Sequence, residues 1–267
     1  MKTRREVIGL LPAGGRATRV APLPCSKELF PVGFHSIGTK RTQRPKVISH
    51  YLLEKFKLAN INKAYIILRD GKWDIPSYFG DGSMLGMHLA YLVMGVPWGV
   101  PYTLDQAYPF IGDSIVALGF PDMIFQPADA FVSLLAKLEE SKADLVLGLF
   151  PTSKPHKTDM VAFNAKGRVK SITIKPAQSK LLYAWELAVW KPVFTRFMHD
   201  SVASKNFRAC ASNRESHPHK QKELHVGDVI QAALENGLKI DTVIFENGSC
   251  LDIGTPEDMV KAIRDEV

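Results

Sequence analysis

The 267 residues of the chain, 46% of them hydrophobic, suffice to bury the core of one large α/β domain, so the whole chain is expected to form a single domain. Its net charge of +7 comes from Lys and Arg residues spread along the sequence without a basic tract, which argues against a nucleic-acid partner and favours a small anionic substrate. No apolar run approaches the roughly 20 residues that cross a bilayer, so we expect no membrane span and no membrane partner.

The first predicted element is a buried strand over residues 7–11 (VIGLL), which a proline and the pair Gly14-Gly15 then stop. Glycines at the end of a strand leave backbone N–H groups open to an anion, because no Cβ blocks a close approach. Arg16, Arg19 and Lys27 add three cations nearby in the sequence. The alternative is an ordinary glycine-rich turn with solvated basic residues. Strand, turn and cations together favour a phosphate-binding loop.

The same loop carries a resemblance to a known family. GGRATR at residues 14–19, a proline soon after it, and KELFP at residues 27–31 resemble the signature of the sugar-phosphate nucleotidyltransferases, GGxGTR followed by a proline and KxxxP. The segment is neither a Walker loop nor the dinucleotide fingerprint, since it lacks both GK[ST] and GxGxxG. Ala17 replaces the third glycine of the signature, a change that fits if its φ is negative.

The resemblance implies an α/β fold with a Rossmann-like, mixed but mostly parallel sheet flanked by helices, of the GT-A-like kind, with a small β-hairpin lobe for the sugar. It implies catalytic roles for Arg19 and Lys27. It divides the chain into a nucleotide-binding part over about 1–150, an acceptor-binding part over about 151–250 and a closing helix over 256–267. The implied nucleotide-binding residues of the loop are Leu11, Ala13, Gly14, Gly15, Arg16 and Thr18.

After the loop, the polar residues 34–43 are predicted to form a surface insertion. Apolar residues at helical spacing predict a helix over 47–59, with Pro45 near its start, and residues 64–68 (AYIIL) predict a second parallel strand. Residues 79–89 contain GDGS, which resembles a family segment that shapes the wall of the base pocket. A plain turn is the alternative there.

A strand predicted over residues 89–93 leads to Met94, which aligns with a family glutamine whose amide reads the pyrimidine edge. Pro97 and Gly99 match the family residues that follow, so the resemblance implies that all three line the nucleotide site. A thioether cannot form the hydrogen bonds of an amide. The base therefore stays open among UTP, dTTP, CTP and GTP.

Asp122 follows a third predicted strand over residues 115–118 (IVAL). Ligands of open α/β sheets bind just beyond the strand ends, so chemistry is expected at this position. The family has LGD here, and its aspartate holds Mg²⁺; this chain reads LGFPD. An aspartate in a plain turn at the strand end is the alternative. A helix over 127–140 and a strand over 143–150 are predicted next.

Residues 151–176 alternate apolar and polar residues around NAKG, which predicts a β-hairpin. The hairpin resembles the family segment ending in EKP, whose lysine contacts the sugar phosphate. Lys175 matches that lysine, although an ordinary solvated lysine is the alternative, and Ile174 replaces the glutamate. Asp159 stands where the family has a sugar-contacting pair, and an acceptor hydroxyl or amine is its expected ligand. Glu186, in a strand predicted over 183–190, is a further candidate acceptor contact.

The histidines of the next segment, His217, His219 and His225, have no Cys or carboxylate at ligand spacing. We therefore expect loop histidines there and no metal site. A helix over 226–236 and a strand over 240–245 follow.

The C-terminal segment CLDIGT closely resembles the family motif LDxGT, whose aspartate is the second ligand of the catalytic Mg²⁺. The resemblance therefore implies that Asp252 is a metal ligand. Thr255 is placed to cap a helix predicted over 256–264.

These residues favour one reaction, in which an oxygen of a sugar 1-phosphate attacks the α-phosphorus of a nucleoside triphosphate and releases pyrophosphate. Mg²⁺ held by Asp122 and Asp252 would bridge the two anionic substrates. Arg19, Lys27 and Lys175 would neutralise phosphate charge. The acceptor phosphate is already ionised at neutral pH, so no general base is needed.

Two other functions stay open. A regulatory subunit that binds nucleotide without catalysis is favoured only by the Phe-Pro insertion before Asp122. A metal-dependent glycosyltransferase would need an Asp-Xaa-Asp motif, which the sequence lacks. The odd number and wide spacing of Cys25, Cys210 and Cys250 are typical of reduced thiols and predict a cytoplasmic protein. A homo-oligomer is compatible with these features.

Overall fold

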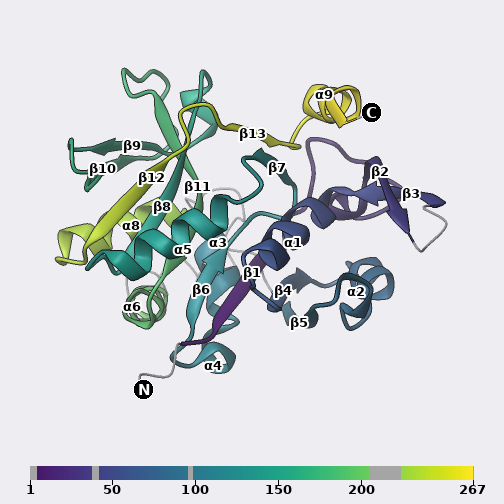
Figure 1. The fold of residues 1–267 in the computed structure, drawn as a ribbon, viewed down its shortest axis with the longest axis horizontal. Coiled ribbons are helices and arrows are strands. Elements are labelled where there is room, and N and C mark those ends of the chain that lie inside the picture. Colours follow the sequence, from purple (N-terminus) through teal and green to yellow (C-terminus); the bar gives the residue numbers. More distant parts are fainter. Residues whose placement is uncertain (1–4, 38–41, 96–98, 205–223, 267) are drawn as a thin grey trace, which may run out of the picture.

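In a computed structural model of the chain, the structure describes residues 5–37, 42–95, 99–204 and 224–266. Within these ranges nine strands form one sheet (Figure 1). β1 (Val7–Ala13) lies at the centre of its parallel half, between β4 (Lys63–Arg69) and β6 (Ile115–Leu118), and β5 (His88–Met94) forms the edge beyond β4. All strand pairs in this half are parallel, as predicted for the mostly parallel part of a mixed α/β sheet.

The other half of the sheet is joined to the first through β11 (Tyr183–Trp190). One edge of β11 pairs with β8 (Leu145–Pro151), which in turn pairs in parallel with β12 (Ile240–Ile244). The other edge is shared between two strands. Its C-terminal residues 188–190 pair with β6, whereas Ala184 pairs with β9 (Met160–Phe163), the first strand of a hairpin completed by β10 (Val169–Thr173). The sheet therefore forks at β11, and residues 185–187 lie between the two branches.

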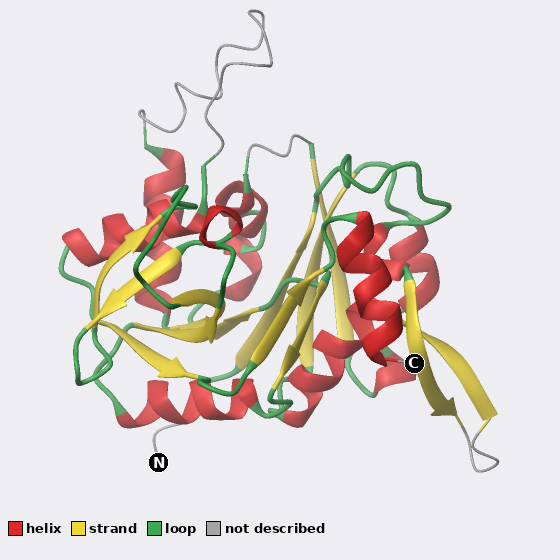
Figure 2. Ribbon diagram, turned by 90° about the horizontal axis from the view of Figure 1, so that it is seen from above, coloured by secondary structure: helices red, strands yellow, loops and turns green. Residues whose placement is uncertain are grey.

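Helices cover both faces of the sheet (Figure 2). α1 (Ile48–Leu58) and α5 (Ala130–Glu140) pack on one face, and α3 (Val100–Asp105), α6 (Pro192–Ala203) and α8 (Val226–Glu235) pack on the other. The side chains of β1 alternate between the two cores, which explains why the strand is apolar throughout. The remaining helical segments are η1 (Lys27–Leu29), α2 (Asp74–Phe79), η2 (Ser83–Leu85), α4 (Tyr108–Ile111), η3 (Pro155–Lys157) and α9 (Pro256–Glu266).

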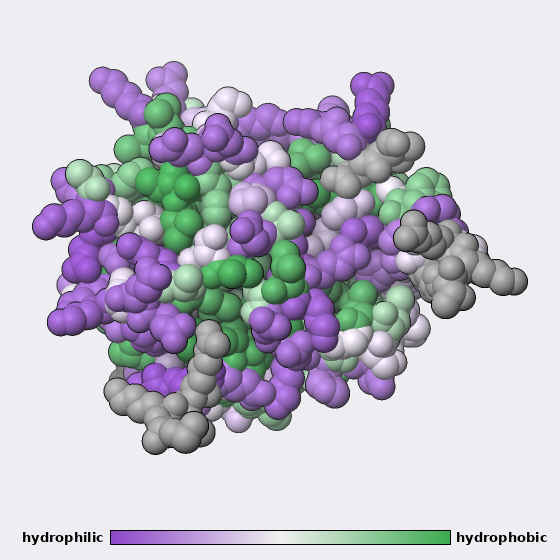
Figure 3. Space-filling view, in the orientation of Figure 1, coloured by the Kyte–Doolittle hydropathy of each residue, from purple (hydrophilic) through white to green (hydrophobic). Residues whose placement is uncertain are grey.

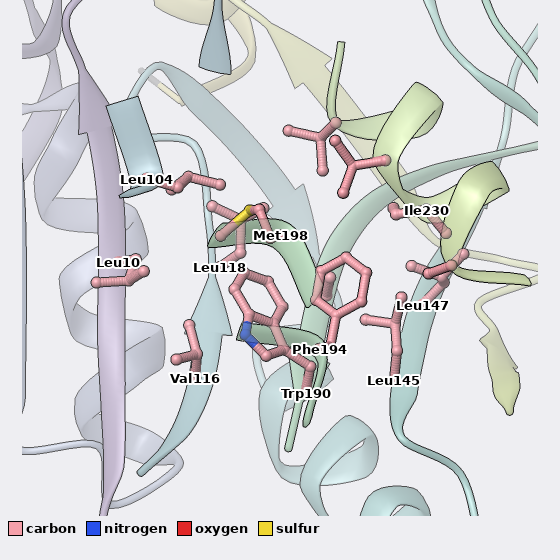
Figure 4. Packing of buried hydrophobic residues seen from close by; sticks show 14 of the residues in the cluster. Leu10, Leu104, Val116, Leu118, Leu145, Leu147, Trp190, Phe194, Met198 and Ile230 are labelled. Carbon is pink, nitrogen blue, oxygen red and sulfur yellow. The ribbon is translucent and has the colours of Figure 1, made fainter. Parts of the chain in front are cut away.

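The core on the α3, α6 and α8 face centres on Trp190, which is fully buried. Its ring packs against Phe194 with 5.3 Å between ring centroids, beside Leu118 and Leu147 (Figure 4). The indole N–H donates a hydrogen bond of 2.9 Å to the Thr195 hydroxyl, so burial leaves no polar atom of the ring unsatisfied. In the view of Figure 3, hydrophilic residues cover most of the surface. No helix in the described ranges has the length and apolar character to cross a membrane.

Two small antiparallel pairs complete the fold. β2 (Pro31–Ile37) and β3 (Thr42–Val47) form a ribbon that projects from the body (Figure 1), and β7 (Met123–Gln126) pairs with β13 (Ser249–Asp252). The sequence predicted a surface insertion over residues 34–43 and placed Pro45 near the start of a helix over 47–59. Residues 34–37 and 42–43 of that insertion belong to the ribbon, Pro45 lies within β3, and α1 begins at Ile48. The ribbon satisfies its backbone groups by cross-strand pairing, which its polar side chains did not reveal.

A buried histidine on α1 has no compensating hydrogen bond. His50 is fully buried, and neither ring nitrogen has a hydrogen-bond partner among the described residues. The rings of His35 and Phe79 lie with centroids 4.9 and 5.2 Å from it. Burial, with the nearby His35 and Lys46, lowers the pKa of His50 to about 4, against a weaker opposing effect of Glu54. The ring is therefore neutral at pH 7.

Replacing His50 with leucine is expected to raise the free energy of unfolding at pH 7 by about 1 kcal/mol, because two unsatisfied buried nitrogens are removed at similar volume. The folded-state pKa of His50 lies below the unfolded value, so the wild type loses stability as the pH falls from about 6.5 towards 4. The leucine variant lacks this loss. Urea unfolding at pH 7 and pH 5 measures both effects, and an equal pH dependence of the two proteins would contradict this account.

Candidate active site

Two carboxylates that are far apart in the sequence meet through the pairing of β7 with β13. Asp122 stands just before β7, and Asp252 ends β13 opposite Met123. The backbone N–H of Ile253 donates a 3.0 Å hydrogen bond to the carbonyl oxygen of Asp122, which fixes the two segments together. Asp122 therefore lies beside Asp252 in spite of the two residues inserted before it, at the sheet edge where sequence reasoning expected chemistry.

Lys27 reaches this carboxylate pair from the N-terminal loop. Its Nζ forms a direct ion pair with Oδ2 of Asp122, with side-chain exposures of 12% and 22%. Burial lowers the pKa of Lys27, but the carboxylates of Asp122, Asp252 and Glu28 outweigh it and raise the pKa overall. Lys27 therefore stays charged at the site.

Arg19 lies against the last turn before α9. A Cβ added to Gly254 would fall 2.8 Å from a guanidinium nitrogen of Arg19 and 2.9 Å from Oδ2 of Asp252, so the three residues are in contact. The carboxylate of Asp252 opens to solvent at the cleft, while the surrounding protein removes part of its hydration. This desolvation and the charge of Asp122 raise the pKa of Asp252 to about 6, against the opposing effects of Lys27 and Arg19.

The donor set of this cluster suits a hard divalent cation. Asp122 and Asp252 supply carboxylate oxygens, and desolvation together with the charge of Asp122 raises the pKa of Asp252. Mg²⁺ prefers such oxygens and commonly takes one or two carboxylates together with substrate phosphates and water. No group of three or more His, Cys, Asp or Glu residues able to hold a metal occurs within the described ranges.

Adding a single methyl group at Gly254 should lower the activity of the protein. Gly254→Ala places a methyl group within contact distance of Arg19 and Asp252, so one of them must shift. Because a misplacement of about 1 Å at a reacting centre can cost about 100-fold, we expect kcat/KM to fall by about 10- to 100-fold with little change in melting temperature. Equal activity of Gly254→Ala and wild type would contradict the arrangement.

Two buried contacts clamp the segment that carries Lys27. Glu28 accepts two hydrogen bonds from Nζ of Lys72, at 2.6 and 2.8 Å, and both side chains are about 95% buried, with exposures of 4% and 5%. Asp74 accepts hydrogen bonds from the backbone N–H and hydroxyl of Ser26, at 2.6 and 2.7 Å. The turn after β4 thereby fixes η1. Sequence reasoning missed this clamp, because its two halves are distant in sequence.

The glycine loop follows the C-terminal end of β1 and packs over Met94. Gly14 lies directly over the Met94 methyl group, since a Cβ at Gly14 would fall 2.0 Å from it, and the Thr103 hydroxyl lies 3.3 Å from the Met94 sulfur. Met94 is thus buried beneath the loop, and its thioether offers no hydrogen bond of the kind an amide makes. Leu11 and Ala13, also named from the sequence as nucleotide-binding residues, are fully buried.

Other predicted loop residues are more open. Arg16, Thr18 and Arg19 are exposed, and nothing lies within 4 Å of a Cβ built on Gly15. Ala17 has a φ of +53°, so the expectation that alanine fits there with a negative φ is wrong: the third glycine of the signature marks a left-handed position.

Two further residues belong to the segment after Met94. Gly99 packs against the Leu224 backbone with a φ of +125°, a conformation that favours glycine. Pro97 lies outside the described residues.

A depression of about 430 Å³ beside the loop gathers positive charge. It is lined by Arg16 and Lys27 from the predicted loop and by Arg69 and Lys72 from the end of β4 and the turn after it. Nε of Arg69 lies 3.5 Å from the Gly15 carbonyl oxygen. Sequence reasoning missed Arg69 and Lys72, although two cations just after a parallel strand are a usable signal for an anion site.

A separate cleft of about 280 Å³ runs from the carboxylate pair to the fork of the sheet. The fork explains it, since residues 185–187 of β11 lie between β6 and β9, and the register with β8 shifts between Trp185 and Leu187. Such a bulge allows consecutive residues to face the same side. Trp185 and Glu186 accordingly both line the cleft, and it also contains Asp122, Asp159, Lys175 and Asp252.

The acceptor-side residues named from the sequence therefore come together here. Burial, with the charges of Asp252 and Asp159, raises the pKa of Glu186 to about 8, so this side chain is mostly protonated at pH 7 and can donate a hydrogen bond. Lys175 is exposed with a φ of +39°, a left-handed conformation that is rare outside glycine and that clusters at ligand sites. His225 also lines the cleft, whereas His217 and His219 lie outside the described residues.

Comparison with known proteins agrees with this arrangement. A sequence model of the family described as nucleotidyl transferase matches residues 8–267. The chain belongs to this family. The resemblance seen in the glycine loop is thereby confirmed.

Several relatives align with this nucleotidyl transferase over nearly its whole length. It is 26% identical to the low-salt glycan biosynthesis nucleotidyltransferase Agl11 of Haloferax volcanii over 95% of its residues, and it spans 64% of that protein. It is 26% identical to a glucose-1-phosphate thymidylyltransferase of Neisseria meningitidis over 95% of its residues and spans 80% of that protein. A glucose-1-phosphate thymidylyltransferase of Actinoplanes sp. is 27% identical over 96% of this chain, which spans 76% of it.

Solved structures confirm the fold class. A Bacillus anthracis protein described as a glucose-1-phosphate thymidylyltransferase, crystallised with sucrose, superposes with a TM-score of 0.77 at 20% identity, covering 97% of this chain and 95% of the other. UDP-glucose pyrophosphorylase bound to UDP-glucose gives a TM-score of 0.75 at 15% identity, covering 97% and 98%. At these identities the likeness shows the fold, which is the GT-A-like arrangement expected from the sequence.

Proposed function

We propose that this nucleotidyl transferase joins a nucleoside triphosphate and a sugar 1-phosphate, giving an NDP-sugar and pyrophosphate. The observation that carries the proposal is the meeting of Asp122, Asp252, Lys27 and Arg19 at one end of the cleft. The relatives named glucose-1-phosphate thymidylyltransferase support the same reaction class.

Both substrates are anions that repel one another, so the site must supply positive charge. Asp122 and Asp252 would hold Mg²⁺, which when bound withdraws charge from phosphate oxygens and lowers this repulsion. Lys27 and Arg19 add fixed cations beside the same two carboxylates. Arg16 and Arg69 extend the positive region into the depression by the glycine loop, where the pyrophosphate part of the triphosphate has room, whereas Lys72 is paired with Glu28.

The bond changes need no proton transfer by the protein. An oxygen of the acceptor phosphate forms a bond to the α-phosphorus, and the bond from that phosphorus to the bridging oxygen of pyrophosphate breaks. A phosphate monoester has its second pKa near 6, so the attacking oxygen is already ionised at pH 7. Lys175, at the acceptor side of the cleft, is placed to meet the acceptor phosphate. The task of the protein is therefore orientation and charge neutralisation.

The non-catalytic alternative has lost its main support. It depended on the Phe-Pro insertion carrying Asp122 away from the site, whereas Asp122 lies beside Asp252 and binds Lys27. Met94 provides no amide that could read the base, so comparing the four nucleoside triphosphates identifies the preferred base.

Pyrophosphate release tests the proposal. The protein is incubated with UTP, dTTP, CTP or GTP and with glucose, galactose, mannose or glucosamine 1-phosphate, in Mg²⁺ or in EDTA. We expect release with at least one pair in Mg²⁺ and loss of it in EDTA. Binding of nucleotide with no release for any pair would favour the regulatory protein and overturn the proposal.

A further inference from the structure

Two polar atoms in the cleft are buried without hydrogen bonds. They are Oδ1 of Asp159 and the indole N–H of Trp185, whose residues are 8% and 5% exposed. Apart from the ring nitrogens of His50, no other buried side-chain polar atom of the described residues lacks a partner. Such groups lower stability and are rare in folded proteins, so each calls for an explanation.

The two residues are neighbours across the fork of the sheet. Asp159 directly precedes β9, and its carbonyl oxygen accepts a 3.3 Å hydrogen bond from the backbone N–H of Trp185. Burial raises the pKa of Asp159, while Lys175, His225 and the Trp185 N–H act in the opposite direction. The Trp185 N–H thus acts on the Asp159 carboxylate as a hydrogen-bond donor, yet neither this N–H nor Oδ1 reaches full hydrogen-bond geometry with any described residue.

The carboxylate of Asp159 is held in place from behind. A Cβ added to Gly227, in the first turn of α8, would fall 2.4 Å from Oδ2 of Asp159 and 2.5 Å from the side chain of Ile174. Phe120 packs near the Trp185 ring, with 6.1 Å between ring centroids. Close packing thus surrounds both groups.

A matched pair of one donor and one acceptor selects its ligand by chemistry. A hydroxyl group accepts from the indole N–H and donates to the carboxylate at the same time. An ammonium group has no acceptor for the N–H, and a carbonyl has no donor for the carboxylate. We propose that Asp159 and Trp185 form a hydroxyl-binding subsite that selects acceptors with a free hydroxyl at this position, an inference that rests on the proposed function. Trp185 is new as a site residue, because in the sequence it reads as part of an apolar strand.

The main variant is Trp185→Phe, which removes the N–H and keeps an aromatic ring. We expect KM for the hydroxylated acceptor to rise by about 10-fold and KM for the nucleotide to stay within twofold, since a missing partner to a substrate hydroxyl weakens acceptor binding alone. Melting temperature should not fall, because the removed N–H had no partner. Asp159→Asn should raise the same KM by about 10-fold through loss of the charge-assisted bond.

Trp190→Phe is the matched control, since the indole N–H of Trp190 is bonded to Thr195. This variant should lower melting temperature and leave acceptor selectivity unchanged. The opposite pattern in the two tryptophan variants distinguishes a ligand-binding N–H from a structural one.

The decisive comparison uses the best turned-over sugar 1-phosphate of the panel and its monodeoxy analogues. In the wild type, kcat/KM for one deoxy analogue should be at least about 10-fold lower than for the parent sugar 1-phosphate. In Trp185→Phe, the ratio of these two kcat/KM values should approach one. An equal penalty in both proteins, or preference for glucosamine 1-phosphate that Trp185→Phe does not change, overturns the subsite.

Failure of the subsite is separate from failure of the proposed function. Wild-type pyrophosphate release establishes the function whatever the variants do. If no pair turns over, the same acceptors are titrated by calorimetry. Weaker binding by Trp185→Phe of a hydroxylated acceptor then supports the subsite, and equal binding, or no binding of any acceptor, overturns it.

Discussion

Asp252→Asn is expected to lower kcat/KM for pyrophosphate release by about 1,000-fold, an effect that corresponds to about 4 kcal/mol of transition-state stabilisation. The substitution keeps the shape of the side chain and removes one of the two carboxylates proposed to hold Mg²⁺. Under the proposed function it weakens the hold on Mg²⁺ and leaves the phosphate charges less balanced. The measurement is initial rate against substrate concentration at several Mg²⁺ concentrations, where a raised Mg²⁺ requirement is also expected.

Folding should survive this change. Burial and the neighbouring Asp122 already raise the pKa of Asp252, so its charge is a burden on the metal-free protein, and the variant should melt at or above the wild-type temperature in EDTA. Asp113→Asn makes the same chemical change on a side chain that is 80% exposed and outside the cleft, and its activity should stay within twofold of wild type. More than a tenth of wild-type activity in Asp252→Asn would contradict the assigned role.

Lys72→Met is expected to lower the free energy of unfolding at pH 7.5 by about 3 to 5 kcal/mol, because it leaves the Glu28 carboxylate buried without its partner. Burial already raises the pKa of Glu28, and Lys72 is the main opposing influence. Without Lys72 the pKa rises further, so Glu28 takes up a proton more readily in the folded state. A group with a raised folded-state pKa favours folding at low pH and loses that contribution as pH rises, so the deficit should shrink at pH 5.5.

Two companion variants make this result specific. The double variant Glu28→Gln with Lys72→Met should recover most of the lost stability, since no unpaired charge remains. Lys63→Met breaks an ion pair with Glu6 whose side chains are 54% and 49% exposed, and its effect on stability should be much smaller, because water screens such a pair. Urea unfolding of the set measures these differences. A Lys72→Met protein as stable as Lys63→Met would show that the clamp does not hold η1.

The apolar runs of the sequence predicted most of the sheet and its covering helices. The strands over 115–118 and 183–190 have the predicted bounds, and the helix predicted over 47–59 is α1 with its ends moved by one residue. Each depends on residues close in sequence, where side-chain period and burial coincide. The glycine loop was recognisable for the same reason, since its signature is continuous.

Features that depend on distant contacts were not predictable in this way. β7 and β13 are short strands that pair with each other, and this pairing brings Asp122 to Asp252. Lys72 and Arg69 gave no local pattern that tied them to the loop. The left-handed φ of Ala17 contradicts the ordinary preference of alanine, because the loop around it fixes the backbone.

By itself, the sequence determined that this chain has a mostly parallel α/β sheet, a phosphate-type loop and two aspartates worth testing, since these follow from local periodicity and continuous motifs. Only the tertiary structure decided which residues share the cleft. The fork at β11 brings Trp185, a residue of the buried core, to the wall of the cleft, and it sets Asp159 beside it. The reason is that strand pairing joins segments through backbone hydrogen bonds, which side-chain pattern does not encode.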